Sequence, residues 1–274
     1  MKYYAQTTKY LAKNGIYLLP FAILPALFFA FSIDQTSVVE VFKSLFAGDF
    51  NIPFTYIFRA FSLFNYASTA HTLLGLVGVV LLIVCVSMIM AFLEKHMRIG
   101  KRSFNGLFSK VNDNVLSTGF IILLFATIYQ LWALITSAAF YIFTFIKSSI
   151  AVYTLWILTY LASRFFMVYF LSYFYLWLPS LQLTGFKAIE AFRASYVLVS
   201  PVQFRISLSQ FISLVVLESA IFLAVWFFSG WLVSFIVAAL SYVFVICVFF
   251  VRMQIVYFDR AELDRADLKN KYYV

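Results

Sequence analysis

Long apolar runs separated by short polar stretches recur along the whole chain. A helix needs about 20 consecutive apolar residues to cross the hydrocarbon core of a membrane. Six stretches reach or approach this length, and they lack the alternation of apolar and polar residues expected of barrel strands. They are residues 16–32, 73–93, 116–141, 151–178, 206–228 and 231–256. The pattern predicts an all-α integral membrane protein with six transmembrane helices.

The first stretch is short and contains Pro20 and Pro25. Proline is tolerated in a membrane helix where neighbouring groups satisfy the freed backbone, so we expect a kinked span. Basic residues before an apolar run are also typical of a signal peptide. However, no small-residue cleavage site follows, and five further apolar stretches come after it. We therefore expect an uncleaved first span.

The composition agrees with this class of protein. Of the 274 residues, 64% are hydrophobic and only 11% are charged, whereas an ordinary soluble domain has about 25% charged residues. The apolar segments occupy most of the length, so we expect one transmembrane domain over residues 1–274. No folded basic domain remains that could bind nucleic acid. We interpret the net charge of +9 as contact with anionic lipid.

The distribution of Lys and Arg predicts the orientation. With the N-terminus inside, the segments on the cytoplasmic side hold 16 of the 20 basic residues, and the outer segments hold only Lys43, Arg59 and Lys147. Basic residues favour cytoplasmic loops, so we expect a multi-pass protein of the cell membrane with both termini in the cytoplasm. Its expected partner is membrane lipid, with anionic inner-leaflet lipid at the basic loops. A protein partner is a further option.

Residues 33–72 form the one large outer segment that the pattern predicts. Ser37 and Glu40 have the spacing of a capping box, and an aromatic-rich stretch follows at residues 52–64. Both regions are predicted to be short helices on the outer interface. They are interpreted either as a cap over the end of the bundle or as a lid or docking surface for a partner.

Amphipathic stretches precede several of the spans. Apolar residues recur at helical spacing in residues 104–111 and 186–199, and a similar stretch lies around residues 10–14. Phe108 and Phe192 are 84 residues apart. This spacing indicates three repeated units, each an interfacial helix followed by a helical hairpin. The alternative is that basic amphipathic stretches gather at the inner face of any membrane protein.

Three short motifs carry a resemblance to a known group of proteins. They are Trp177-Leu-Pro179, the run from Gly185 to Ser195, and Tyr257-Phe-Asp259-Arg. Over roughly residues 80–260 the chain resembles a broad group of bacterial six-span proteins of unknown function, similar to the membrane domain attached to some glycerophosphodiester phosphodiesterases. The resemblance implies a six-helix membrane fold. It implies no phosphodiesterase activity, because no segment is long enough for the soluble enzyme domain.

Two charged residues lie deep in predicted spans, Arg164 in the fourth and Glu218 in the fifth. Counted along the helices they lie at similar depths, and an unpaired charge there is costly, so we expect them to pair. The pair is interpreted as a structural ion pair or as a midplane site for a substrate, ion or proton. If unpaired, each would face a wet cavity. Gln130 is predicted to form an interhelical hydrogen bond, and Arg252 to snorkel to the cytoplasm.

Catalytic and metal-binding patterns are not evident. His71 and His96 lie at opposite ends of the second span and cannot share a metal, and Cys85 and Cys247 are expected to be small buried hydrophobes. The sequence has no nucleophile elbow, phosphate-binding loop or zinc-protease motif. It therefore indicates a protein that is not an enzyme and that has no cofactor.

Two classes of function remain. The favoured class is a transport-related or envelope-associated membrane component that handles a small molecule, lipid or ion. The alternative is a non-catalytic membrane scaffold or accessory subunit of a larger complex. A large polar cavity reaching the middle of the membrane would favour the first class. A solidly packed bundle with an exposed apolar groove would favour the second.

Overall fold

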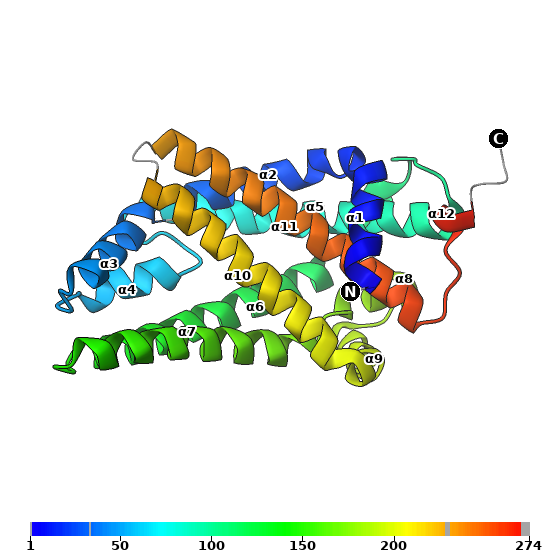
Figure 1. Cartoon of the computed structure of the whole chain (residues 1–274). Helices are drawn as coiled ribbons and strands as arrows, with labels where there is room; N and C mark the ends of the chain where they lie inside the picture. The colour runs from blue at the N-terminus through cyan, green and yellow to red at the C-terminus, as the bar shows by residue number, and fades with distance from the viewer. Residues whose placement is uncertain (1, 33, 228–230, 270–274) are drawn as a thin grey trace.

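The computed structural model describes residues 2–32, 34–227 and 231–269, and within them the fold is all-α with no strand. The predicted all-α fold class is therefore confirmed. The α-helices (Figure 1) are α1 (Lys2–Asn14), α2 (Leu19–Ser32), α3 (Gln35–Ala47), α4 (Phe54–Phe61), α5 (Thr69–Ile99), α6 (Leu107–Phe143), α7 (Ser149–Ser172), α8 (Trp177–Thr184), α9 (Ala188–Val199), α10 (Gln203–Phe227), α11 (Trp231–Arg260) and α12 (Ala266–Lys269).

Among the described residues, five helical stretches are long and apolar enough to cross a membrane, or six if the bent pair α1–α2 counts as one span. Helices α5, α6, α10 and α11 cover the second, third, fifth and sixth predicted stretches. Phe228 of the fifth stretch and Ile33 of the predicted outer segment lie outside the described residues. The fourth stretch is divided, because α7 ends at Ser172 and a turn separates it from α8.

A sharp bend separates α1 from α2. The chain turns by 91° between residues 2–17 and 19–32, at a short 3-10 turn over Gly15–Tyr17. This bend precedes both Pro20 and Pro25, the residues from which the sequence predicts a kinked span. Pro20 lies in the first turn of α2, where a missing N–H leaves no helical hydrogen bond unmade. Helix α2 alone has 14 residues, which is short for a membrane crossing.

The long helices run along the bundle, with α3 and α4 at one end and α8, α9 and α12 at the other (Figure 1). We call these the α3–α4 end and the terminal end. Helices α10 and α11 lie together near the α3–α4 end and diverge towards the terminal end, where α1 crosses and contacts α11.

The main core lies at the terminal end. It includes Phe92 and Met97 of α5, Leu178 of α8 and Ile255 of α11, all of them buried. A second buried cluster joins α3 and α4 to α6 and α7 at the opposite end. Its fully or nearly buried members are Val41, Leu45, Ile52, Ile57, Phe140, Val152 and Trp156. The two short helices therefore pack on the ends of α6 and α7, as expected for a cap over the bundle.

The N-cap of α3 differs from the predicted one. Asp34 Oδ1 accepts a hydrogen bond from the backbone N–H of Ser37 at 3.1 Å, and the Ser37 hydroxyl donates to Asp34 Oδ2 at 2.6 Å. Helix α3 therefore begins at Gln35, and the capping box predicted from Ser37 and Glu40 was wrong. The physical reason is that Asp34, three residues earlier, has a carboxylate that satisfies the N3 donor.

Glycine allows α2 to lie close to α5. A Cβ atom added at Gly78 would lie 3.2 Å from Cβ of Phe28. One added at Gly75 would lie 2.8 Å from a ring carbon of Phe64 and 3.2 Å from Cβ of Ser32. Contacts this short are at or below the lower limit of ordinary Cβ contacts, so a side chain at either position requires a neighbour to shift.

The three predicted repeat units differ in their first helix. Helix α1 precedes the first hairpin, and α9 precedes the third through a 3-10 turn at Ser200–Val202. In the second unit, residues 107–111 form the first turns of α6, which continues to Phe143. The side chains of residues 107–114 lie outside the description. A separate short helix therefore precedes only the first and third hairpins in the described part of the chain.

Candidate functional site

A cavity of about 720 Å³ lies among α5, α6, α7, α10 and α11. This volume is within the range of about 300–1,000 Å³ that is usual for small-molecule sites. Phe, Leu, Val, Ile, Met and Ala side chains form most of the lining. The residues of the lining that carry polar side-chain groups are Tyr4, Tyr129, Tyr175, Trp177, Gln210, Ser213, Ser241 and Arg252. The cavity is therefore suited to an apolar ligand that carries a small polar part.

The cavity is open at its side. The exposed lining residues include Val216 of α10 and Leu240 and Phe244 of α11. These are the two helices that diverge in Figure 1. The outer surface of the long helices is itself apolar, with exposed residues such as Leu131, Ile135, Ile157 and Phe170. An apolar molecule can therefore pass from the apolar exterior into the cavity without crossing a polar surface.

Arg252 lies at the end of the cavity nearer the terminal end and is only 4% exposed. Its Nε donates to the Tyr175 hydroxyl at 3.3 Å, and its Nη1 donates to Ser209 Oγ at 2.7 Å. No described carboxylate forms an ion pair with it. The prediction that Arg252 snorkels to the cytoplasm was therefore wrong. Its side chain turns into the bundle because two hydroxyl groups accept its hydrogen bonds. One lies in the turn that precedes α8, and the other lies on α10.

The N-terminal half of α1 closes this end of the cavity. Tyr4 lines the cavity, and its ring centroid is 5.9 Å from the guanidinium carbon of Arg252. Asp259 of α11 holds the helix in place, because its Oδ1 pairs with Lys2 Nζ at 2.7 Å and its Oδ2 accepts from the Tyr3 hydroxyl at 2.6 Å. Helix α1 is thus attached to the same helix that carries Arg252.

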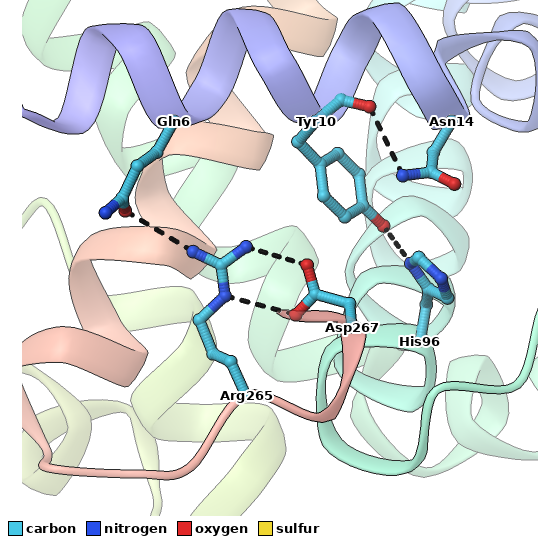
Figure 2. A network of polar contacts seen from close by, with 6 residues as sticks. All are labelled: Gln6, Tyr10, Asn14, His96, Arg265 and Asp267. Carbon is cyan, nitrogen blue, oxygen red and sulfur yellow. Dashed lines mark hydrogen bonds and ion pairs between the residues drawn. The ribbon is translucent and has the colours of Figure 1, made fainter. Parts of the chain in front are cut away.

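A second set of polar contacts attaches α1 to α5 and to the C-terminal segment (Figure 2). The Tyr10 hydroxyl is hydrogen-bonded to His96 Nδ1 at 2.7 Å. Burial raises the pKa of the Tyr10 phenol above its usual value, so the phenol keeps its proton. Arg265 donates to Gln6 Oε1 at 3.4 Å and forms a two-point contact with Asp267, at 2.8 and 3.2 Å. These contacts hold the chain ends together over the terminal end.

The structure brings Arg164 and Glu218 together. Arg164 Nη2 of α7 lies 2.6 Å from Glu218 Oε1 of α10. The Tyr160 hydroxyl donates to Glu218 Oε2, and Arg164 Nη1 donates to the Tyr129 hydroxyl at 3.4 Å. Both carboxylate oxygens and both terminal guanidinium nitrogens therefore have partners.

Aromatic rings surround the guanidinium group of this ion pair. The guanidinium carbon of Arg164 lies 4.1 Å from the ring centroid of Trp132, and between 5.7 and 5.9 Å from those of Phe61, Tyr129 and Tyr160. Arg164 itself is only 3% exposed. The rings add cation–π attraction to the guanidinium and cover it, while the Glu218 side chain is 25% exposed. Because each charge is satisfied by the other, this geometry suits a structural connection between α7 and α10 better than a binding site for an ion.

Gln130 forms two hydrogen bonds with the segment that follows α4. Its Oε1 accepts from the backbone N–H of Leu63 at 3.2 Å, and its Nε2 donates to Ser62 Oγ at 2.9 Å. The sequence predicts a contact with another long helix, and the structure instead joins α6 to the connection between α4 and α5. Gln130 thus helps to hold the α3–α4 end on the bundle.

The remaining candidate residues, two histidines and two cysteines, do not come together in one site. His71 and His96 lie near opposite ends of α5, and Cys85 and Cys247 are buried free thiols. Within residues 2–32, 34–227 and 231–269, no group of three or more His, Cys, Asp or Glu residues could hold a metal ion. The described geometry therefore offers no centre for metal chemistry.

Sequence reasoning missed the polar end of the cavity. Ser209 and Gln210 are adjacent polar residues inside an apolar stretch, and that pattern was the available signal. Their connection to Arg252 depends on how α10 and α11 are rotated. No protein-family model, curated protein or solved structure matches the chain. The interpretation of the cavity therefore depends on its own geometry.

Proposed function

We propose that the chain is a multi-pass protein of the cell membrane that binds the apolar chain of a membrane lipid in the cavity among α5, α6, α7, α10 and α11. It would then be a transport-related or envelope-associated component that handles lipid. Six crossings, with the short α2 as the first, would leave both termini on the same side of the membrane. The distribution of Lys and Arg favours the cytoplasm for that side, with the terminal end at the inner face and the α3–α4 end at the outer face.

The basic residues support this orientation. Lys101 and Lys187 lie in the connections at the terminal end, and Lys43 and Lys147 lie at the α3–α4 end. The connections at the terminal end are the richer in Lys and Arg, as expected of cytoplasmic loops. Helix α1, bent by 91° from α2, would lie in the inner interface.

The observation that carries the proposal is the apolar lining of a cavity that opens towards an apolar exterior. An ion or polar solute would need polar groups along its path, and this lining has few. Arg164 and Glu218 satisfy each other, which leaves no charge free for ion transport at that depth. Lipid is the apolar ligand that a membrane supplies at high concentration. The cavity is apolar, so it is not the polar cavity expected for transport of a polar solute, and the proposal depends on the apolar lining instead. A scaffold would use the same opening as an exposed apolar groove for a protein partner.

The test measures how much lipid the full-length protein retains after extensive washing in detergent. Native mass spectrometry counts the lipid molecules that stay bound. Ala126 of α6 lines the cavity, whereas Ala138 on the same helix is exposed and does not. We expect Ala126→Trp to reduce the amount of retained lipid at least about twofold, because the indole ring would occupy the space that the apolar chain of the lipid fills. Ala138→Trp should retain as much as the unmodified protein. Equal retention by the two variants, or no retained lipid at all, would refute the proposal.

A further inference from the structure

The two arginines buried in the predicted spans differ in how their charge is compensated. Arg164 and Arg252 are 3% and 4% exposed. Arg164 pairs with Glu218 at 2.6 Å. Arg252 hydrogen-bonds only to the neutral hydroxyls of Tyr175 and Ser209, and no described carboxylate pairs with it. A guanidinium that is charged, buried and uncompensated is costly in an apolar environment.

Donors without acceptors gather beside Arg252. Arg252 donates through Nε and Nη1, and no described residue accepts a hydrogen bond from its Nη2. Gln210 lines the same cavity, lies beside the same Tyr175 hydroxyl, and has a buried Nε2 without a hydrogen-bond partner. Buried donors are normally satisfied. An acceptor that carries negative charge would satisfy both donors and balance the guanidinium at this end of the cavity.

We infer that this end of the cavity binds the headgroup of an anionic lipid, with Arg252 as the charge partner and Gln210 as a second donor. The inference rests on the proposed function, in which the apolar chain of the lipid fills the rest of the cavity. The forked guanidinium suits the oxygens of a phosphate or carboxylate, and charge-assisted hydrogen bonds of this kind are strong.

The position of Arg252 fits a lipid from the inner leaflet. Arg252 lies four residues before the predicted inner end of the last span at residue 256, about 6 Å along the helix axis. Tyr4 of α1 lines the cavity beside it. The headgroup would thus lie just inside the inner interface, beneath α1, while the chain extends towards Tyr129 and the middle of the bundle.

The test compares two lipids with identical chains. The full chain, purified in detergent, is supplied with equal amounts of dioleoyl phosphatidylglycerol, which is anionic, and dioleoyl phosphatidylcholine, which is zwitterionic. Native mass spectrometry then counts each retained lipid. We expect phosphatidylglycerol to be retained about tenfold over phosphatidylcholine, the effect expected of one charge-assisted hydrogen bond. In Arg252→Gln this preference should disappear.

Matched variants make the result specific. Arg205→Gln removes the same charge from an exposed position on α10, one turn before Ser209, and should keep the preference. Arg252→Lys keeps the positive charge but lacks the forked guanidinium group. Gln210→Leu removes the second hydrogen-bond donor without changing any charge. Each should reduce the preference by about twofold to fivefold. These two variants decide the question if Arg252→Gln does not yield a folded protein.

The outcomes separate this inference from the proposed function. Equal retention of the two lipids by the unmodified protein, or a preference that survives in all three cavity variants, overturns the headgroup inference. The proposed function then still holds if Ala126→Trp reduces total retained lipid. If Ala126→Trp and Ala138→Trp retain the same amount, the proposed function fails as well.

Discussion

Arg164 on α7 and Glu218 on α10 form an ion pair 2.6 Å apart, and aromatic rings from α4, α6 and α7 surround its guanidinium group. The pair joins two helices that are separated in sequence by α8 and α9. A buried pair of this kind depends on both members, because loss of one leaves the other without compensation.

Replacement of one member should therefore be more harmful than replacement of both. We expect Glu218→Leu, which leaves the buried Arg164 unpaired, to lower the free energy of unfolding by about 3–5 kcal/mol. Arg164→Leu should lower it less, because the Glu218 side chain is 25% exposed. The double variant should be more stable than either single one, since no unpaired charge remains. Unfolding followed by circular dichroism in detergent measures the three changes. A double variant no more stable than the singles would contradict the pairing.

Gly78 should tolerate a side chain poorly, because α2 lies close. A Cβ atom there meets Cβ of Phe28 at 3.2 Å, and a Cβ atom cannot rotate away as the tip of a side chain can. We expect Gly78→Ala to destabilise the protein by about 1–3 kcal/mol. Gly119 of α6 is the control, because its nearest neighbour, Ile83, would be 3.6 Å away. Gly119→Ala should be neutral or stabilising. The same thermal shift for both variants would contradict the close approach.

The N-cap of α3 should depend on Asp34 and not on Glu40. Asp34 accepts from the backbone N–H of Ser37, so Asp34→Ala should cost about 0.5–2 kcal/mol and speed amide hydrogen exchange at the start of residues 35–47. Glu40 contacts Lys43 at 3.7 Å, and both side chains are at least half exposed. Glu40→Ala should therefore change exchange very little. The reverse result would restore the capping box expected from the sequence.

The hydroxyl of Tyr10 should hold α1 on α5. Tyr10→Phe removes its hydrogen bond to His96 and leaves a buried ring nitrogen without its partner, at a cost of about 1–3 kcal/mol. We expect faster hydrogen exchange along residues 2–14. Tyr4→Phe makes the same change on the same helix, but no described residue hydrogen-bonds the Tyr4 hydroxyl, so exchange should be unaltered. Unchanged exchange in Tyr10→Phe would show that other contacts suffice.

Several features of the fold could be predicted from the chain alone. Apolar runs of about 20 residues imply helices, and α5, α6, α10 and α11 cover the four such runs predicted around them. Counting residues from the span ends was enough to expect Arg164 and Glu218 at one depth, because the rise of a helix is constant. Membrane insertion, the orientation and the resemblance to six-span membrane proteins stay predictions.

Other features could not be predicted because they depend on contacts between distant segments. Several neighbouring positions could have formed the bend before α2 or the N-cap of α3, and the local sequence does not distinguish among them. Gln130 could have faced any neighbour, and its partners Leu63 and Ser62 come from a connection whose path the sequence leaves open. Side-chain hydrogen bonds of this kind carry no periodic signal.

The sequence by itself determined which segments are helices and how deep each charged residue lies along them. Only the tertiary structure decided which face of each helix points inward. In the predicted spans all faces are apolar, since lipid and a protein core accept the same side chains, and the hydrophobic pattern therefore contains no rotational information. The packing of α10 against α11 turned Arg252 towards Ser209 and away from the exterior.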